Sequence, residues 1–120
     1  MRCTGWLDPD MVELAYRSAD VLFVPSLYEG LPRAVIEAWS FALPVVATNR
    51  VALAPTIDTV GGQIVQYGNP GEAADALSSI LADAHLARRY GNAGRELVQE
   101  RFCLNRSVEM TEALYRRLEE

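Results

Sequence analysis

Residues 21–48 of this 120-residue chain read VLFVPSLYEGLPRAVIEAWSFALPVVAT, and this stretch decides the fold. Two unbroken apolar runs, at 21–24 and 45–48, have the length and β-branched composition of buried strands. Between them, residues 32–41 have the period of a helix, with one apolar face made by Val35, Ala38, Trp39 and Ala42. Strands without polar alternation are covered on both faces, so we predict a βαβ unit with parallel strands rather than a hairpin.

The loop at 25–31 is the candidate binding segment, because ligands of open parallel sheets bind at the carboxyl ends of the strands. Pro32 is expected at the first helical position, where its missing N–H costs nothing. The amides then left facing outward at the helix start are those of Leu31, Arg33 and Ala34. Free N–H groups at a helix N-terminus attract anions, and Gly30 lets a phosphate approach the backbone without a Cβ in the way.

Two runs carry a family resemblance: PSLYEGLP at 25–32 and EAWSFALPVVAT at 37–48. Together they resemble the donor-binding segment of retaining glycosyltransferases with the GT-B fold, the family-4 type. Glu29 and Glu37 reproduce the E-x7-E spacing of that family, and the similarity extends from about Thr4 to the end of the chain. The resemblance implies an α/β fold: a three-layer, Rossmann-like partial parallel sheet that forms the second half of a GT-B C-terminal domain.

In that family the first acid of the motif lies beside the donor sugar and the second binds the ribose of the nucleotide. The resemblance therefore implies that Glu29 is the acid at the catalytic centre and that Glu37 binds the ribose. The residues implied for the diphosphate are Gly30, Leu31, Arg33 and Ala34. The expected donor is a UDP- or GDP-sugar, with no metal and no other cofactor required.

Each acid also has an explanation that needs no ligand. Glu29 beside a helix start is stabilised by the helix macrodipole by roughly 0.3–1 kcal/mol. Arg33 and Glu37 are four residues apart on one helix, so a surface ion pair worth about 0.3–0.5 kcal/mol would account for both. The prediction that both acids bind a ligand rests on the joint pattern, in which they flank a Gly-Leu-Pro helix start after a buried strand.

The composition is that of a soluble globular domain: 50% of the residues are hydrophobic and 22% are charged. A formal net charge of −5 argues against binding to nucleic acid or to an anionic membrane. No apolar run approaches the ~20 residues of a membrane span, so we expect a cytoplasmic protein. Cys3 and Cys103 are expected to be reduced thiols, and His85 is expected on the surface.

We expect residues 1–120 to form a single truncated donor-binding domain, with C-terminal helices from about residue 71. Asp8 is the predicted N-cap of a first helix, whose apolar stripe is Met11, Leu14, Ala15 and Ala19. Residues 49–62 read as a loop with at most one helical turn, and 64–65 as a last short strand. Three helices follow, at about 70–83, 86–101 and 104–118, and the inward residues of the last are Val108, Ala113, Leu114 and Leu118.

A complete transferase of this kind also has an acceptor domain, and loops that bring Arg and Lys side chains to the leaving diphosphate. Here all 11 basic residues are Arg, so Arg33 is the candidate substitute. The Gly-rich turn that the family usually places after the second strand is replaced by RVALAP at 50–55. Because the charge on the leaving group must be stabilised, we expect a chain that binds the donor but does not transfer sugar alone.

Two other functions stay open: a degenerate binding or regulatory module, and a structural homo-oligomer with a vestigial pocket. Binding of UDP- and GDP-sugars separates them, because only the last binds none. The expected partners are the nucleotide sugar, a separate chain that carries the acceptor domain, and a second copy of this chain. The second copy is expected because strand 21–24 corresponds to the fourth of the order 3-2-1-4-5-6, and its neighbour, the first strand, is missing. An open strand edge pairs with another chain unless something covers it, and residues 1–5 are the candidate cover.

Overall fold

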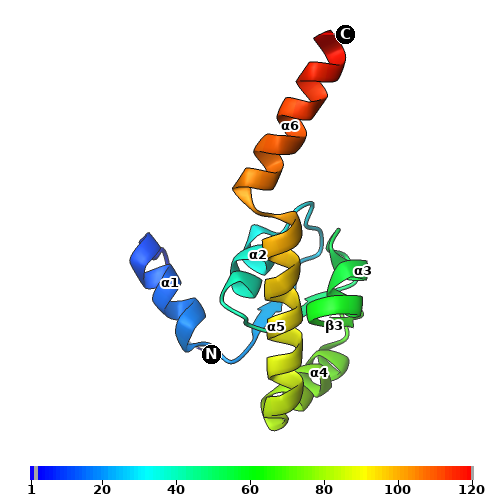
Figure 1. The fold of residues 1–120 in the computed structure, drawn as a ribbon. Coiled ribbons are helices and arrows are strands. Elements are labelled where there is room, and N and C mark those ends of the chain that lie inside the picture. Colours follow the sequence, from blue (N-terminus) through cyan, green and yellow to red (C-terminus); the bar gives the residue numbers. More distant parts are fainter. Residues whose placement is uncertain (2, 120) are drawn as a thin grey trace.

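The computed structural model describes residues 1 and 3–119, and it shows a small α/β body from which a final helix projects (Figure 1). In chain order the elements are α1 (Pro9–Ser18), β1 (Leu22–Val24), α2 (Arg33–Ser40), β2 (Val45–Thr48), α3 (Ala54–Thr56), a π-helical turn (Ile57–Gly61), β3 (Gly62–Val65), α4 (Pro70–Ala82), α5 (Ala84–Arg101) and α6 (Leu104–Glu119). The predicted helix boundaries are confirmed to within one or two residues. The short α3 and the π-helical turn occupy the segment predicted as a loop.

The three strands form one parallel sheet in the order β1-β2-β3. Leu22 lies opposite Val45, and Val45 lies opposite Gly62. The predicted βαβ unit with parallel strands is therefore confirmed. The last strand begins at Gly62, two residues earlier than the sequence indicated, because Gly62 and Gln63 extend the ladder beside β2.

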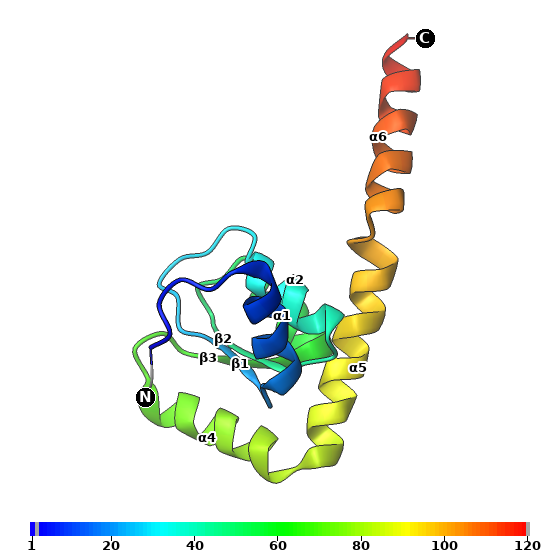
Figure 2. The same ribbon diagram turned by 90° about the vertical axis from the view of Figure 1, so that its left-hand side faces the viewer.

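Helices cover both faces of the sheet, which gives three layers. Figure 2 shows α2 above the sheet and α4 below it. Alternate residues of β2 face the two layers: Val45 and Ala47 pack with Trp39 of α2, whereas Val46 packs with Ile80 of α4. All four side chains of β2 are buried, as expected for a central strand covered on both faces.

The predicted inward faces of the first and last helices are wrong. In α1 no residue is buried, Met11 and Leu14 are exposed, and the half-buried pair is Val12 and Tyr16. In α6 every side chain described is exposed, including Val108, Leu114 and Leu118, and the helix projects from the body (Figures 1 and 2). Helical periodicity shows that a face is apolar, but it does not show that the partner of that face lies in the same chain.

The chain exposes more surface than a compact protein of its mass. Its accessible area is 8494 Å², against about 6,450 Å² expected for a 13.3 kDa monomer, an excess of about 2,000 Å². Its radius of gyration of 16.1 Å exceeds the ~13.6 Å of a compact domain of this length. Within the described residues, no strand pairs with the outer edge of β1, and residues 3–5 are exposed and irregular.

Three smaller predictions concern the cysteines, His85 and membrane-spanning helices. Both cysteines are free and exposed, and His85 is exposed near the start of α5. Asp83 caps α5 by accepting hydrogen bonds from the amides of His85 and Leu86, and the bond from Leu86 is the main reason that the pKa of Asp83 is lowered. Across residues 1 and 3–119, none of the helices has the length and hydropathy needed to cross a membrane.

Candidate functional site

The loop after β1 is held against the loop after β2. The Thr48 hydroxyl donates to the carbonyl of Ser26 at 2.6 Å, and the amide of Ala52 donates to the carbonyl of Glu29 at 2.9 Å. Glu29 and Val51 form an isolated parallel bridge. These contacts fix the backbone of Glu29 at the carboxyl end of the sheet. They also occupy the amide of Ala52, which belongs to the segment 50–55.

The start of α2 keeps its backbone donors free. Pro32 is the N-cap, with ψ 91°, rather than the predicted first helical residue, because its extended ψ places it just before the helix. Its carbonyl accepts from the amide of Val35 at 2.9 Å, and it supplies no side-chain cap. Among the described residues, no acceptor is found for the amides of Leu31, Arg33 and Ala34. The predicted cluster of free N–H groups is therefore present, and such a cluster suits an anion.

Gly30 lies in open space beside these amides. A Cβ built at Gly30 would meet no atom within 4 Å, and its φ is outside the left-handed region. Neither packing nor backbone conformation in this chain therefore requires glycine there. The role of Gly30 beside a bound phosphate stays a prediction from the sequence.

The Glu29 side chain is half-buried beside the helix start. Among the residues described, its carboxylate has neither a hydrogen-bond donor nor an ion-pair partner. The carboxylate is thus available to a ligand, and its position before α2 also fits stabilisation by the helix macrodipole.

Glu37, by contrast, is held by two neighbours. Its Oε2 accepts a hydrogen bond from the Tyr16 hydroxyl of α1 at 3.0 Å. Its Oε1 lies 3.7 Å from the Arg33 guanidinium, whose side chain is 86% exposed. The predicted ion pair between Arg33 and Glu37 is therefore present, but it is long and solvated, and it adds little stability. Burial first, and then the hydrogen bond and negative charge of Glu37, raise the pKa of Tyr16 to about 12.

A groove of about 630 Å³ runs between α1 and α2, and Glu37 lies in its wall. The wall also includes the charged group of Arg33 and the aromatic rings of Trp6, Tyr16 and Phe41. Trp6 is almost fully exposed at the mouth of this groove. Glu13 lines the groove as well. Flat rings combined with two carboxylates and a guanidinium can bind a small molecule that has both a planar part and hydroxyl groups.

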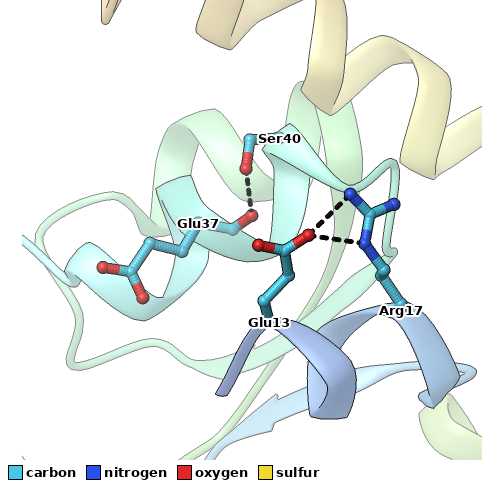
Figure 3. Close-up of polar contacts among 4 residues, drawn as sticks. All are labelled: Glu13, Arg17, Glu37 and Ser40. Atoms are coloured by element: carbon cyan, nitrogen blue, oxygen red, sulfur yellow. Dashed lines mark hydrogen bonds and ion pairs between the residues drawn. The ribbon is translucent and has the colours of Figure 1, made fainter. Parts of the chain in front are cut away.

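Figure 3 shows how the charges near this groove are arranged. On α1, Arg17 pairs with Glu13 at 2.7 Å, and the Glu37 carboxylate points away from that pair (Figure 3). On α2, the Ser40 hydroxyl donates to the backbone carbonyl of Glu37 at 2.6 Å (Figure 3). Arg17 is thus engaged elsewhere, and Arg33 is the basic side chain that faces Glu37.

The predicted site residues fall in two adjacent places. Gly30, Leu31 and Ala34 lie at the start of α2 beside Glu29, whereas Arg33 and Glu37 line the groove. Glu29 is not among the residues of the groove wall. The sequence reasoning missed Tyr16, Trp6 and Phe41. The spacing of Val12 and Tyr16, which is one helical turn, is the signal that could have found the first of these.

Known proteins resemble this chain over most of its length. The profile of the family described as glycosyl transferases group 1 matches residues 1–83. Alpha-maltose-1-phosphate synthase of Mycolicibacterium smegmatis is 36% identical over 108 residues, which are 84% of this chain and 28% of that protein. Trehalose synthase of Rubrobacter xylanophilus is 41% identical over 88 residues, or 73% of this chain and 21% of that protein.

Solved structures show the same fold. Sucrose-phosphate synthase from Thermosynechococcus elongatus superposes with a TM-score of 0.85 at 33% identity, and the match covers 96% of this chain and 29% of that one. The C-terminal domain of a glycosyl transferase group 1 family protein from Francisella tularensis superposes with a TM-score of 0.75 at 25% identity, covering 83% of this chain. The present chain thus spans less than a third of the length of the curated relatives described above.

Proposed function

Because the chain belongs to the group 1 glycosyl transferases and has a parallel α/β sheet like that of GT-B enzymes, we propose that it is a donor-binding part of a retaining transferase. The observation that carries the proposal is the arrangement around α2. Free amides lie at the helix start, and one turn further on the Glu37 carboxylate lies in the wall of an aromatic groove. This order suits a ligand with a negatively charged end and a polar ring, such as a UDP- or GDP-sugar.

Each residue then has a defined task. The amides of Leu31, Arg33 and Ala34 bind the diphosphate, and Gly30 leaves room for it. Glu37 accepts hydrogen bonds from the ribose hydroxyls, since a carboxylate oxygen has lone pairs beyond those used within the chain. Glu29, whose carboxylate has no partner among the described residues, lies beside the donor sugar. The free thiols of Cys3 and Cys103 fit a reducing compartment, and we place the chain in the cytoplasm.

We further propose that the chain by itself does not transfer sugar. The leaving nucleoside diphosphate must be stabilised by positive charge as the glycosidic bond breaks. The chain contains no Lys, and the side chain of Arg33 is exposed and directed to Glu37. A retaining transferase also needs an acceptor held beside the donor, which a partner chain with an acceptor domain would supply.

A second candidate function is a structural homo-oligomer whose groove is vestigial. The excess of about 2,000 Å² of exposed surface favours it, because this area is what a large permanent interface covers on each partner. The two candidates differ in one measurable property, since only the donor-binding chain binds nucleotides.

Titration of the chain with UDP, GDP and their hexose derivatives, followed by NMR, tests the proposal. We expect millimolar affinity, near −4 kcal/mol, with shifts confined to residues 28–37 and to the groove. Glu37→Ala should weaken binding severalfold without altering the fold, because Glu37 is a partly exposed helical residue. Glu100→Ala, which removes an exposed acid on α5, is the matched control. Absence of binding by the unmodified chain would reject donor binding.

A further inference from the structure

Tyr16 lies where it can control the conformation of Glu37. Of the described residues, Tyr16 alone donates a hydrogen bond to the Glu37 carboxylate. The two residues are 21 positions apart and belong to different helices, α1 and α2. A glutamate on a helix surface otherwise moves among several rotamers, and a ligand that needs one of them must restrict that motion on binding.

The Tyr16 ring is itself held in place. It stacks on Phe41 with ring centroids 5.6 Å apart and an interplanar angle of 10°. Phe41 also contacts Arg17, whose guanidinium lies 5.0 Å from the ring centroid and is paired with Glu13. The Tyr16 hydroxyl therefore donates to Glu37 from a ring that is held by packing rather than from a mobile side chain.

Arg33 cannot do the same. Its guanidinium is 3.7 Å from Oε1 of Glu37, beyond a good hydrogen bond, and its side chain is 86% exposed. An exposed arginine of this kind neutralises charge, but it does not fix the direction of a carboxylate.

We propose that Tyr16 is a positioning residue for nucleotide binding: it holds Oε2 of Glu37, so that Oε1 is presented to a ribose hydroxyl. This inference rests on the proposed function, because it assigns the ligand class of Glu37 as a ribonucleotide. It adds a residue from α1 to a site that sequence reasoning built from α2 and its preceding loop. Burial raises the pKa of the Tyr16 hydroxyl to about 12, so the hydroxyl keeps its proton at neutral pH and can donate to Glu37.

The test is the preference for ribose over dideoxyribose. UDP and GDP are titrated beside their dideoxyribose analogues, which lack both ribose hydroxyls, into the unmodified chain and into Tyr16→Phe. Phenylalanine keeps the ring that stacks on Phe41 and loses only the hydroxyl, so α1 stays in place. We expect the ratio of ribose to dideoxyribose affinity to fall by about threefold to tenfold, which is the net effect of one typical hydrogen bond. Tyr115→Phe, on the exposed α6, is the control and should leave the ratio unchanged.

A double-mutant cycle separates positioning from a structural role. In a Glu37→Ala background, which has no acceptor for the Tyr16 hydroxyl, Tyr16→Phe should have no further effect on the ratio, because the two residues act through one interaction. A merely structural tyrosine would weaken the ribose and dideoxyribose ligands equally and would leave the ratio constant.

The outcomes are distinguishable. If the unmodified chain binds ribonucleotides selectively and Tyr16→Phe is equally selective, the positioning role is wrong and the proposed function stands. If the unmodified chain binds nucleotides without selectivity, Glu37 does not contact ribose, and the inference fails with it. If the unmodified chain binds no nucleotide at all, the proposed function is rejected, and the inference that rests on it is rejected too. A drop in selectivity on Tyr16→Phe that Glu37→Ala reproduces supports the inference.

Discussion

The indole of Trp39 donates a hydrogen bond to the carbonyl of Gly61 at 3.1 Å, and the same ring lies against Gly94 of α5. A Cβ added at Gly94 would overlap the ring, and Trp39 is fully buried. Small residues on α5 thus let it approach α2 closely enough to cover the sheet, and the site at the start of α2 depends on this packing.

Gly94→Ala should destabilise the chain by about 1–3 kcal/mol, since overpacking outweighs the helix propensity that alanine gains. Gly71→Ala is the control: it is also helical, and its new Cβ would come no closer than 3.5 Å to the Asn69 side chain. Urea unfolding followed by circular dichroism measures both. A Gly94→Ala variant as stable as Gly71→Ala would show that α5 does not pack tightly against the indole of Trp39.

Ala42, two residues after the end of α2, has a backbone conformation that favours glycine. Its φ is 55°, its amide donates to the carbonyl of Trp39, and the amide of Leu43 donates to that of Ala38, which is a Schellman motif. Ala42→Gly should therefore stabilise the fold by about 0.5–1 kcal/mol, because a left-handed alanine is strained. Thermal unfolding measures the change. Destabilisation would mean that the Ala42 methyl contributes more through packing than the strain costs.

Gly30 offers a separation of binding from stability. Because a Cβ there meets nothing within 4 Å, Gly30→Ala should leave the unfolding free energy within about 0.5 kcal/mol of the original. Diphosphate binding should nevertheless weaken, since the methyl group occupies the approach to the amides of Leu31 and Arg33. Inorganic pyrophosphate is a sufficient probe, titrated by NMR. Equal pyrophosphate affinity in the original chain and in Gly30→Ala would show that the diphosphate does not bind at this loop.

The pKa of Tyr16 predicts how stability changes with pH. Its folded value of about 12 lies above the ordinary value of 10.0, so in that window the unfolded chain has lost a proton that the folded chain keeps. The contribution to stability is complete below about pH 10 and is lost as the pH rises towards 12. No Lys titrates in this range. Urea unfolding at about pH 9 and about pH 11 should show a smaller decrease for Tyr16→Phe than for Tyr115→Phe.

The βαβ unit could be predicted because its signals are local. Two short apolar runs that lack polar alternation and are rich in β-branched residues indicate buried strands, and the GLP turn at 30–32 marks the helix between them. The free amides at the start of α2 follow from the same turn, and a one-residue error in the place of Pro32 did not change them. Sequence patterns predict these elements correctly because neighbouring residues in the chain determine their structure.

The parts that failed depend on contacts between distant segments. The Tyr16–Glu37 hydrogen bond requires α1 to lie over α2, which no periodicity within either helix encodes. The apolar stripe of α6 was assigned to the core, yet Leu114 and Leu118 are exposed. An apolar stripe indicates that a helix can pack on an apolar surface, but it does not indicate where that surface lies. The sequence therefore predicted the residues that are proposed to bind the ligand, and it did not indicate Tyr16, which contacts Glu37 from another helix.

The free edge of β1 leads to the last prediction, the oligomeric state. Phe23 of β1 is 37% exposed and lines an apolar groove of about 480 Å³ with Tyr67 and Leu77. The sequence offered two outcomes for this edge, and residues 3–5 do not cover it. We expect two chains to join at β1 around a two-fold axis, because an open ladder beside an apolar surface is a template for a second strand.

Sedimentation velocity at micromolar concentration should show a species of twice 13.3 kDa. Phe23→Lys should shift the equilibrium to monomer, since a charged residue on an edge strand opposes pairing and cannot be buried in the apolar groove. Leu114→Lys is the matched variant on the other exposed apolar surface, α6, and should leave the dimer intact if β1 is the interface. Dissociation by Leu114→Lys alone would place the contact on α6. A monomer in the unmodified chain would show that the open edge stays unpaired, and that the excess of exposed surface needs a different partner.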